Sequence, residues 1–328
     1  MPMTLSAWID GRQAFGERPV DDDLVVFDAP LSNQVSLFDL AVQRGDGVFE
    51  ATTVWHGTAL SLRPHLARLA HSAALLDFSV LDIEALEHAV QSLISEYQRR
   101  AAPPAQEQQL VKILVSRGDD PQLLGGREGD PGVARVWAII EPRSDSPAQP
   151  DRQQLVTLAT GVSADTAHFA PWMLRGAKTL SYASNKAMYR ECARRGANNA
   201  ILYSTEGVML ECPTSSIVFR VNGTLCTPDP SLGILYGTTQ REFFAYARSQ
   251  GITCEYGRYA VEMLQQADAI WTMGGSNVRP VEQLDGRPIA IDEELAVAVN
   301  LYSRSHQDEV CAHSLAEFAD FTSRQGAN

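Results

Sequence analysis

Residues 176–188 read GAKTLSYASNKAM, and this stretch holds two of the three lysines in the chain. The third is Lys112, so nearly all of the 27 basic residues are arginines. Genome composition explains part of that bias. Arginine, however, has too high a pKa to lose its proton and form a Schiff base with a carbonyl group. A lysine in this stretch is therefore a candidate for that chemistry.

The two lysines of the stretch occupy different settings. Lys178 follows the loop-like APWMLRGA and stands at the start of a helix that we predict over about 179–195. Lys186 lies eight residues later, about 12 Å along a helix at ~1.5 Å per residue, so the two cannot serve one carbonyl carbon interchangeably. Lys112 lies in the alternating QLVKILVS, where a solvent-facing or edge-strand lysine is expected. Lys178 is the stronger candidate, and an ordinary residue at a helix start is the alternative.

Composition limits the class of protein. The 328 residues are 45% hydrophobic and 20% charged, as in ordinary globular proteins. The net charge of −13 argues against a nucleic-acid backbone as ligand. The five cysteines and seven histidines show no metal-ligand spacing, so we expect no metal and reduced thiols.

Targeting signals are not expected. The first residues, MPMTLSAWIDGRQAF, lack a basic region followed by an apolar core, and no apolar run approaches the ~20 residues of a membrane span. We therefore expect a cytoplasmic protein with no membrane partner.

The order of helical and strand patterns predicts a mixed α/β protein with two lobes. Strand patterns with Asp-Gly and His-Gly turns open the chain, and two helices are predicted over 63–77 and 82–100. The polar stretch PRSDSPAQPD is the best candidate for a linker. We therefore place an N-terminal domain at 1–142, a linker at 143–151 and a C-terminal domain at 152–328, whose last ~35 residues look helical.

Several other residues could form a site with the lysine. Glu211 ends the apolar strand pattern GVMLE; such an acid is usually solvated, but it could hold a protonated ring nitrogen. Thr239 and Glu242 fit a capping box in GILYGTTQREFF, and a helix N-terminus of this kind can bind phosphate. The small-residue turn in TMGGSNV offers more amides, and Arg68 on a predicted helix would by default be exposed. Together these features match a pyridoxal phosphate site, which needs an imine lysine, an acid and a phosphate cup.

Six motifs in order resemble the class IV aminotransferase family, the fold type IV pyridoxal phosphate enzymes. They are RGDGVFE (44–50), HLARLAHSAALL (65–76), AKTLSY (177–182), EGVMLECPTSSIVF (206–219), LGILYGTT (232–239) and QADAIWTMGGSNVRPV (266–281). The resemblance implies a smaller N-terminal α/β domain, a larger C-terminal domain with a barrel-like sheet, and a homodimer.

The resemblance also assigns roles. Lys178 corresponds to the lysine that binds pyridoxal 5'-phosphate, and Glu211 to the acid on the pyridine nitrogen. The phosphate contacts correspond to Arg68, Thr238, Thr239, Gly274 and Gly275, and the residues beside the ring to Thr214 and Ser215. Lys186 inherits no role.

Departures from the family pattern concern the substrate. Phe49 stands where many relatives have tyrosine, Ser216 where many have asparagine, and Arg44 at an often aromatic position. The loop DDPQLLGGRE lacks the Arg-x-His of D-amino acid transaminases, whereas the SRG before it is closest to the 4-amino-4-deoxychorismate lyase branch. Arg44 and Arg127 are candidates for binding substrate carboxylates, although each could equally be a solvated loop arginine.

We therefore expect an enzyme that converts 4-amino-4-deoxychorismate to 4-aminobenzoate and pyruvate, a step toward folate. The alternative within the family is a transaminase acting on a branched-chain amino acid, a D-amino acid or another amine, together with a 2-oxo acid. A cofactor-binding protein without turnover, or a ligand binder with no cofactor, is the alternative from another class.

Overall fold

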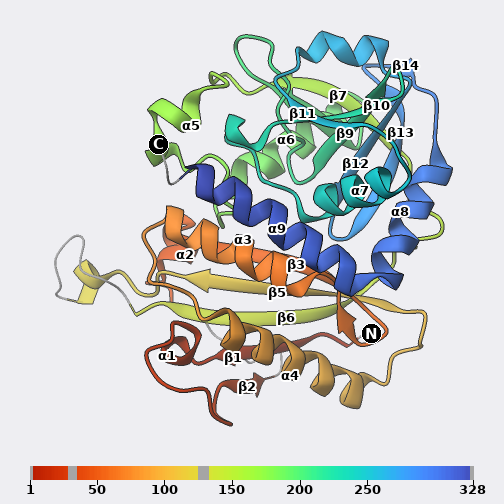
Figure 1. Ribbon diagram of the computed structural model, residues 1–328. Helices are drawn as coiled ribbons and strands as arrows, with labels where there is room; N and C mark the ends of the chain where they lie inside the picture. Colours follow the sequence, from red (N-terminus) through yellow and green to blue (C-terminus); the bar gives the residue numbers. More distant parts are fainter. Residues whose placement is uncertain (1–2, 29–34, 125–132, 326–328) are drawn as a thin grey trace. The chain divides into compact units, whose positions relative to one another are not determined.

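The computed structural model describes residues 3–28, 35–124 and 133–325, and the chain forms two compact units (Figure 1). The N-terminal unit comprises Met1–Ser144 together with Ala177–Tyr182, and the C-terminal unit comprises Asp145–Gly176 together with Ala183–Asn328. The short segment 177–182 thus belongs to the N-terminal unit although the chain on both sides of it belongs to the other. The domain limits expected from the sequence remain a prediction.

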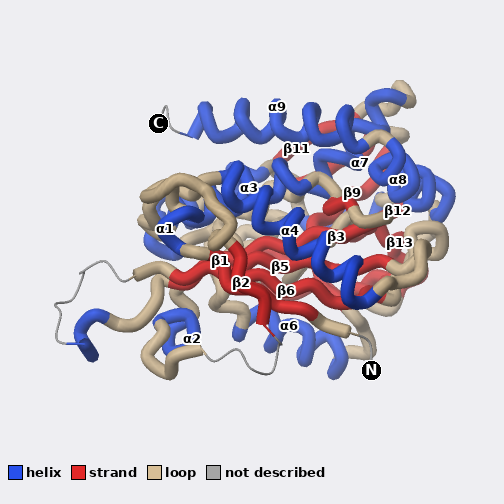
Figure 2. The backbone as a smooth tube through the Cα atoms, turned by 90° about the horizontal axis from the view of Figure 1, so that it is seen from below, coloured by secondary structure: helices blue, strands red, loops and turns tan. Residues whose placement is uncertain are grey.

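The N-terminal unit is built on an antiparallel six-stranded sheet in the order β2-β1-β6-β5-β3-β4 (Figure 2). Helix α3 packs on β3, and α4 packs on β1, β6 and α3. The strands are β1 Leu5–Ile9, β2 Val25–Asp28, β3 Gly47–Trp55, β4 Thr58–Ala59, β5 Gln108–Ser116 and β6 Arg135–Arg143. The helices are α1 Gly11–Ala14, α2 Leu40–Arg44, α3 Leu62–Leu75, α4 Ile83–Ala101 and the 3-10 turn η1 Pro121–Leu124.

The two long helices confirm the prediction from hydrophobic spacing. In α4, Leu86, Val90, Leu93 and Tyr97 recur at intervals of three and four residues and are buried, as one face of a helix requires. Asp82 caps the helix by accepting a hydrogen bond from the Ala85 amide at 3.0 Å.

Of the two predicted turns, only the second forms. His56 and Gly57 join β3 to β4 with φ of 48° and 77°, the left-handed pair of a tight hairpin. Asp10 instead caps the short helix α1, accepting from the Gln13 amide at 3.0 Å. Of the two alternatives for Lys112, the edge strand is wrong, because β5 lies between β3 and β6. Its side chain is partly exposed to solvent, and its amine pairs with Glu141.

The C-terminal unit is built on an eight-stranded mixed sheet in the order β11-β10-β9-β12-β13-β7-β8, with β14 beside β13. Its strands are β7 Gln153–Ala159, β8 Asn199–Tyr203, β9 Ser216–Val221, β10 Thr224–Pro228, β11 Cys254–Gly257, β12 Ala269–Gly274, β13 Asn277–Leu284 and β14 Arg287–Pro288. Its helices are α5 Thr166–Phe169, α6 Ala183–Arg194, α7 Thr238–Ser249, α8 Glu293–Ser305 and α9 Gln307–Gln325, with 3-10 turns η2 Pro171–Met173, η3 Pro230–Leu232 and η4 Val261–Gln266.

The inner strand β12 explains how this unit is held together. Ile270 belongs to one buried apolar cluster, whereas Trp271 and Met273 belong to another. Alternate residues of a strand point to opposite faces, so both faces of the sheet are covered here. Helices α7 and α8 pack on β12 and β13, and α9 packs on α7.

The stretch predicted as a linker contains the boundary between the two units, which falls between Ser144 and Asp145. Beyond that boundary Asp145 pairs with Arg279 at 2.9 Å, and the Pro147 carbonyl accepts from Asn300 at 3.3 Å. One predicted strand differs from expectation. The GVMLE segment makes only isolated bridges, of Met209 with Tyr203 and of Val208 with Ala260, instead of a strand. Among the described helices, none is long and apolar enough to cross a membrane.

Candidate active site

Lys178 lies in an extended segment of the N-terminal unit, and the prediction that it starts a helix is wrong. Helix α6 begins five residues later, at Ala183. The segment runs beside β3: the Lys178 carbonyl accepts from the Phe49 amide at 3.0 Å, and the Leu180 amide donates to the Gly47 carbonyl at 2.8 Å. The Lys178 amide donates to the Ser72 hydroxyl at 3.1 Å. These bonds fix the backbone from which the amine projects.

Two aromatic side chains surround the amine. Lys178 Nζ lies 3.4 Å from the Tyr182 hydroxyl and 4.4 Å from the centroid of the Phe49 ring. The two rings contact each other edge to face at 5.0 Å between centroids. The π face of Phe49 attracts the ammonium form, while the hydroxyl gives the amine a hydrogen-bonding partner. Phe49, a candidate substrate residue in the sequence because it departs from the family pattern, therefore lies against the Lys178 amine.

Arg68 is buried, which corrects the default expectation of an exposed helix arginine. Its guanidinium donates to Glu50 at 2.6 Å and 3.0 Å, and His65 Nδ1 lies 2.8 Å from the same carboxylate. Burial opposes ionisation of Glu50, but the charge of Arg68 and the hydrogen bond with His65 outweigh it, and the pKa of Glu50 lies well below its usual range. Sequence reasoning missed Glu50, because it occupies an inward-facing position of β3 that an apolar residue would normally fill.

The N-terminus of α7 and the glycine turn after β12 lie side by side in the C-terminal unit. Helix α7 begins at Thr238 with Gly237 as its N-cap, and no side chain caps it, so the predicted capping box of Thr239 with Glu242 is wrong. The Thr239 hydroxyl instead accepts from the Ser276 amide at 3.1 Å. This bond joins two segments rich in backbone amides, as a phosphate cup requires.

Close backbone approach explains the glycines of this cup. A Cβ at Gly237 would lie 2.2 Å from the Ser216 hydroxyl, and one at Gly274 would lie 3.3 Å from the Thr214 carbonyl. The turn Thr214–Ser215 and the turn Gly274–Gly275 are therefore neighbours, and a side chain at 237 would require the Ser216 side chain to move.

Glu211 belongs to the same part of the C-terminal unit. Its carboxylate accepts from the Leu235 amide at 3.3 Å, and it lines one small cavity with Ser216, Leu235 and Gly237. It follows a bridged loop, not the end of a regular strand. The structure thus brings Glu211 to the loop that leads into α7.

Helix α6 holds the turn that carries Thr214, and the sequence did not reveal this. Asn185 donates to the Pro213 carbonyl, and the Tyr189 hydroxyl bonds to the Thr214 hydroxyl. The two residues are four apart, so they lie on one face of the helix. Lys186 is exposed on α6.

Of the two candidate substrate arginines, Arg44 lies among the described residues. Arg44 is exposed at the end of α2 and donates to the Gln43 carbonyl at 3.1 Å. Arg127 lies outside the described residues.

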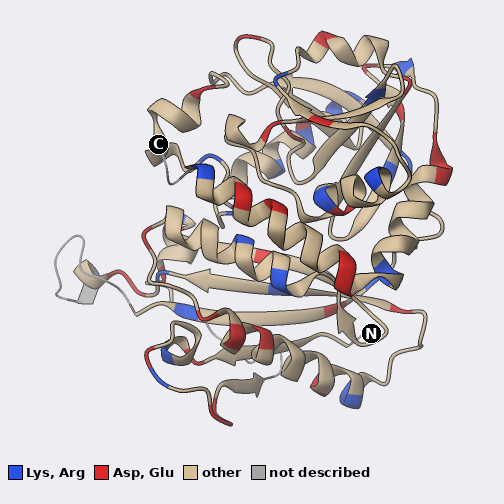
Figure 3. Cartoon of the chain, viewed as in Figure 1, with Lys and Arg blue, Asp and Glu red and all other residues tan. Residues whose placement is uncertain are grey.

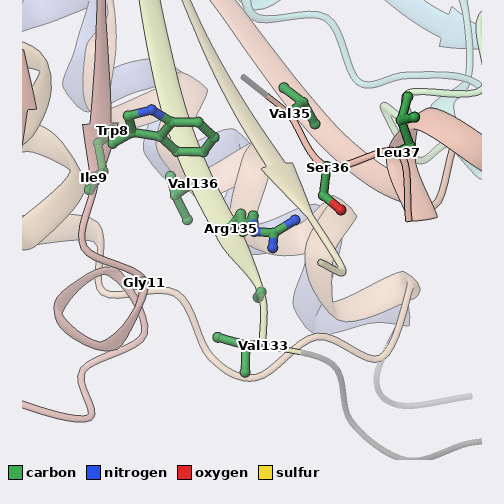
Figure 4. A pocket seen from close by; sticks show the side chains of 10 residues that line it. Trp8, Ile9, Gly11, Val35, Ser36, Leu37, Val133, Arg135 and Val136 are labelled. Atoms are coloured by element: carbon green, nitrogen blue, oxygen red, sulfur yellow. The ribbon is translucent and has the colours of Figure 1, made fainter. Parts of the chain in front are cut away.

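A separate groove of about 740 Å³ opens on the N-terminal unit beside Trp8 and Arg135 (Figure 4). Arg135 is bound there by Asp39 and Asp119, at 2.9 Å and 2.5 Å. None of the candidate cofactor residues lines this groove. In Figure 3 the positions of acidic and basic residues are interspersed along the elements of both units.

Comparisons with known proteins bear on this set of residues. The sequence profile of the family described as Amino-transferase class IV matches residues 47–284. A Mycobacterium tuberculosis protein named bifunctional aminodeoxychorismate lyase / D-amino acid transaminase is 38% identical over 258 residues, which are 76% of this chain and 85% of that protein.

Solved structures agree with the family match. A fold IV transaminase from Curtobacterium pusillum superposes with a TM-score of 0.84 at 34% identity, covering 93% of this chain and 98% of that one. A hypothetical aminotransferase from Mycobacterium tuberculosis in its PLP-bound form gives a TM-score of 0.78 at 31% identity, covering 92% and 98%. The expected fold type IV architecture is confirmed.

The chain belongs to the class IV aminotransferase family. It is therefore an enzyme with pyridoxal 5'-phosphate as its cofactor, and its residues fit that group. Within the N-terminal unit, the Lys178 amine lies against two aromatic rings. Within the C-terminal unit, the Glu211 carboxylate lies at the loop that leads into α7, whose first turn is bonded to the segment after the glycine turn.

Proposed function

We propose that this enzyme converts 4-amino-4-deoxychorismate to 4-aminobenzoate and pyruvate. The observation that carries the choice of a lyase is the 38% identity with the mycobacterial protein, whose name gives lyase activity first. Three stretches that resemble the lyase branch support it: SRG at 116–118, RGDGVFEAT at 44–52 and LECPTSS at 210–216. We also propose a homodimer, as the family resemblance implies, and a cytoplasmic location.

In this proposal Lys178 carries the cofactor through Nζ and afterwards acts as general base. When bound, pyridoxal phosphate supplies an electron sink for the substrate carbon that bears nitrogen. The released amine of Lys178 removes the proton from that carbon, and protein side chains hold it in place during the transfer. The Tyr182 hydroxyl at 3.4 Å and the Phe49 ring at 4.4 Å limit where Nζ can move.

The C-terminal unit would hold the rest of the cofactor. Glu211 keeps the ring nitrogen protonated by placing a negative charge beside it. Thr238 and Thr239 at the positive end of α7, with the turn Gly274–Gly275, bind the phosphate through amides and hydroxyls. Arg68 adds a fixed positive charge from the N-terminal unit.

A transaminase is the second candidate, and a specific observation favours it. The same mycobacterial name includes D-amino acid transaminase, and a D-alanine aminotransferase of Bacillus licheniformis is 26% identical over 78% of this chain. The same residues would serve, with Lys178 moving the proton between two carbon atoms and a 2-oxo acid taking up the amino group.

One assay separates the two. Purified holoenzyme is given 4-amino-4-deoxychorismate alone, and 4-aminobenzoate and pyruvate are measured in equal amounts if the lyase proposal holds. In parallel it is given D- and L-amino acids paired with 2-oxo acids. Ready transamination with no 4-aminobenzoate would replace the lyase by the second candidate.

A further inference from the structure

The last helix of the chain packs on the helix whose N-terminus is proposed to bind phosphate. Helix α9 covers residues Gln307–Gln325 and packs on α7, Thr238–Ser249. The family match ends at residue 284, so α9 lies beyond the matched range. Helix α9 contacts both ends of α7: Ser314, Glu317 and Phe318 contact Tyr236 or Arg241 at its start, and Glu317 also pairs with Arg248 in its last turn.

Arg241 is the centre of this contact. Its side chain is fully buried, and Nε donates to the Ser314 hydroxyl at 2.8 Å. Nη1 donates to the Tyr236 carbonyl at 2.8 Å, and Nη2 lies 3.5 Å from the Thr238 hydroxyl. The guanidinium carbon lies 4.7 Å from the Tyr236 ring and 4.9 Å from the Phe318 ring.

This arrangement compensates the cost of burying a charge. A buried cation is unfavourable unless it is hydrogen-bonded, and here a carbonyl, a hydroxyl and two π faces surround it. Because the guanidinium group is planar and rigid, the bonds of Arg241 to Tyr236 and Ser314 hold three elements in one geometry: the loop before α7, α7 itself and α9.

A second set of bonds holds the same loop. The Tyr236 hydroxyl lies 3.3 Å from both the Tyr256 hydroxyl and the Glu317 carboxylate. Burial raises the pKa of Tyr236 to about 12, so its hydroxyl keeps its proton and remains a donor at neutral pH. Gln240 on α7 donates to Tyr256 at 3.1 Å. Helix α9 therefore contacts both the entry loop and the first turn of α7.

We propose that Arg241, braced by Ser314 of α9, is a positioning residue that sets the geometry of the phosphate cup at Thr238 and Thr239. This rests on the proposed function, in which those residues bind the cofactor phosphate. Donors fixed in place before binding lose less entropy when the phosphate arrives, and a site misplaced by a fraction of an ångström loses affinity. Arg241 acts through the loop and does not itself belong to the cup.

The test compares pyridoxal phosphate with pyridoxal, which lacks the phosphate. Dissociation constants of both for the apoprotein are measured by absorbance titration for the wild type, Arg241→Gln and Ser314→Ala. In Arg241→Gln the cup should lose the equivalent of one hydrogen bond to the charged phosphate, so pyridoxal phosphate should bind roughly tenfold more weakly. Ser314→Ala is the milder change and should weaken binding roughly threefold. The dissociation constant of pyridoxal should change by no more than about twofold in either variant, well below the roughly tenfold change expected for pyridoxal phosphate.

The control is Arg220→Gln. Arg220 is in the same unit, pairs with Asp292 at 2.7 Å and lies 5.5 Å from the Trp271 ring, but it is remote from α9 in its contacts. It should leave both constants unchanged.

The outcomes separate the two proposals. A wild type that binds pyridoxal phosphate no better than pyridoxal contradicts the phosphate cup itself. In a different outcome, the wild type binds pyridoxal phosphate more tightly than pyridoxal, while Arg241→Gln and Ser314→Ala melt at lower temperature but keep the same ratio of the two dissociation constants. That result would make Arg241 merely structural and would overturn this inference. If Arg241→Gln does not fold, unchanged discrimination in Ser314→Ala decides against it.

Discussion

Replacing Glu50 by glutamine should destabilise the N-terminal unit strongly. The carboxylate is 1% exposed and accepts from Arg68 at 2.6 Å and 3.0 Å, with His65 at 2.8 Å. Glutamine keeps the size but removes the charge, so the Arg68 guanidinium stays buried without its counter-charge. Removing one partner of a buried ion pair costs about 3–5 kcal/mol of unfolding free energy.

The assay is urea denaturation of the apoprotein, followed by circular dichroism. With a denaturant slope of about 2 kcal/mol per molar, a loss of about 4 kcal/mol lowers the midpoint by about 2 M. Glu96→Gln is the matched control, because Glu96 also bonds two arginines, Arg99 and Arg100, but at the surface of α4. Its midpoint should move far less, since exposed pairs contribute little.

The pH dependence gives the prediction a sign. The pKa of Glu50 is lowered in the folded state, so its contribution is complete above the unfolded value of about 4.3 and is lost as pH falls toward the folded value. The gap between wild type and Glu50→Gln should stay constant from pH 8 to about 5 and narrow below about 4. A midpoint shift no larger than that of Glu96→Gln, at any pH, would refute the reasoning.

Three further predictions concern the site. Glu211→Gln should keep the cofactor but slow proton abstraction more than tenfold, because a hydrogen bond to a charged group contributes ~1.5–3 kcal/mol; unchanged single-turnover rates would make Glu211 a solvated carboxylate. Gly237→Ala should weaken cofactor binding in titrations, because its Cβ would lie 2.2 Å from the Ser216 hydroxyl, and Ser216→Ala should partly restore it; full affinity without that second change would show that the loop can move. Glutamine at both Arg44 and Arg127 should raise KM for 4-amino-4-deoxychorismate with an unaltered cofactor spectrum, and wild-type kinetics would mean that other groups hold the carboxylates.

The helices and most strands could be predicted because their signals are local. Spacing of buried residues located α3 and α4, and the His56–Gly57 pair located a hairpin. The segment around Lys178 was mistaken for a helix start because its partner, β3, lies more than a hundred residues earlier in the chain. Pairing across such a distance leaves no mark in the local pattern.

The residues of the candidate site divide in the same way, into those that local motifs identify and those whose partners lie far away in the chain. The motifs gave the residue types, and the structure shows Thr238, Thr239 and the glycine turn joined through Ser276. The capping box failed because Thr239 uses its hydroxyl for that long-range bond. Arg68 on α3 is buried because it pairs with Glu50 on β3, and neither residue signals the other in the local sequence. The contact of Arg241 with α9 depends on Ser314, which in the sequence is an ordinary serine of a polar helix.

The most direct test of the central claim is to locate the cofactor on the chain. Holoenzyme is reduced with borohydride, digested and mapped by mass spectrometry for the pyridoxyl group. The chain has three lysines, so the answer has few alternatives. The account predicts the label on Lys178. A label on Lys112 or Lys186, or a protein that carries none after loading with pyridoxal phosphate, would contradict it.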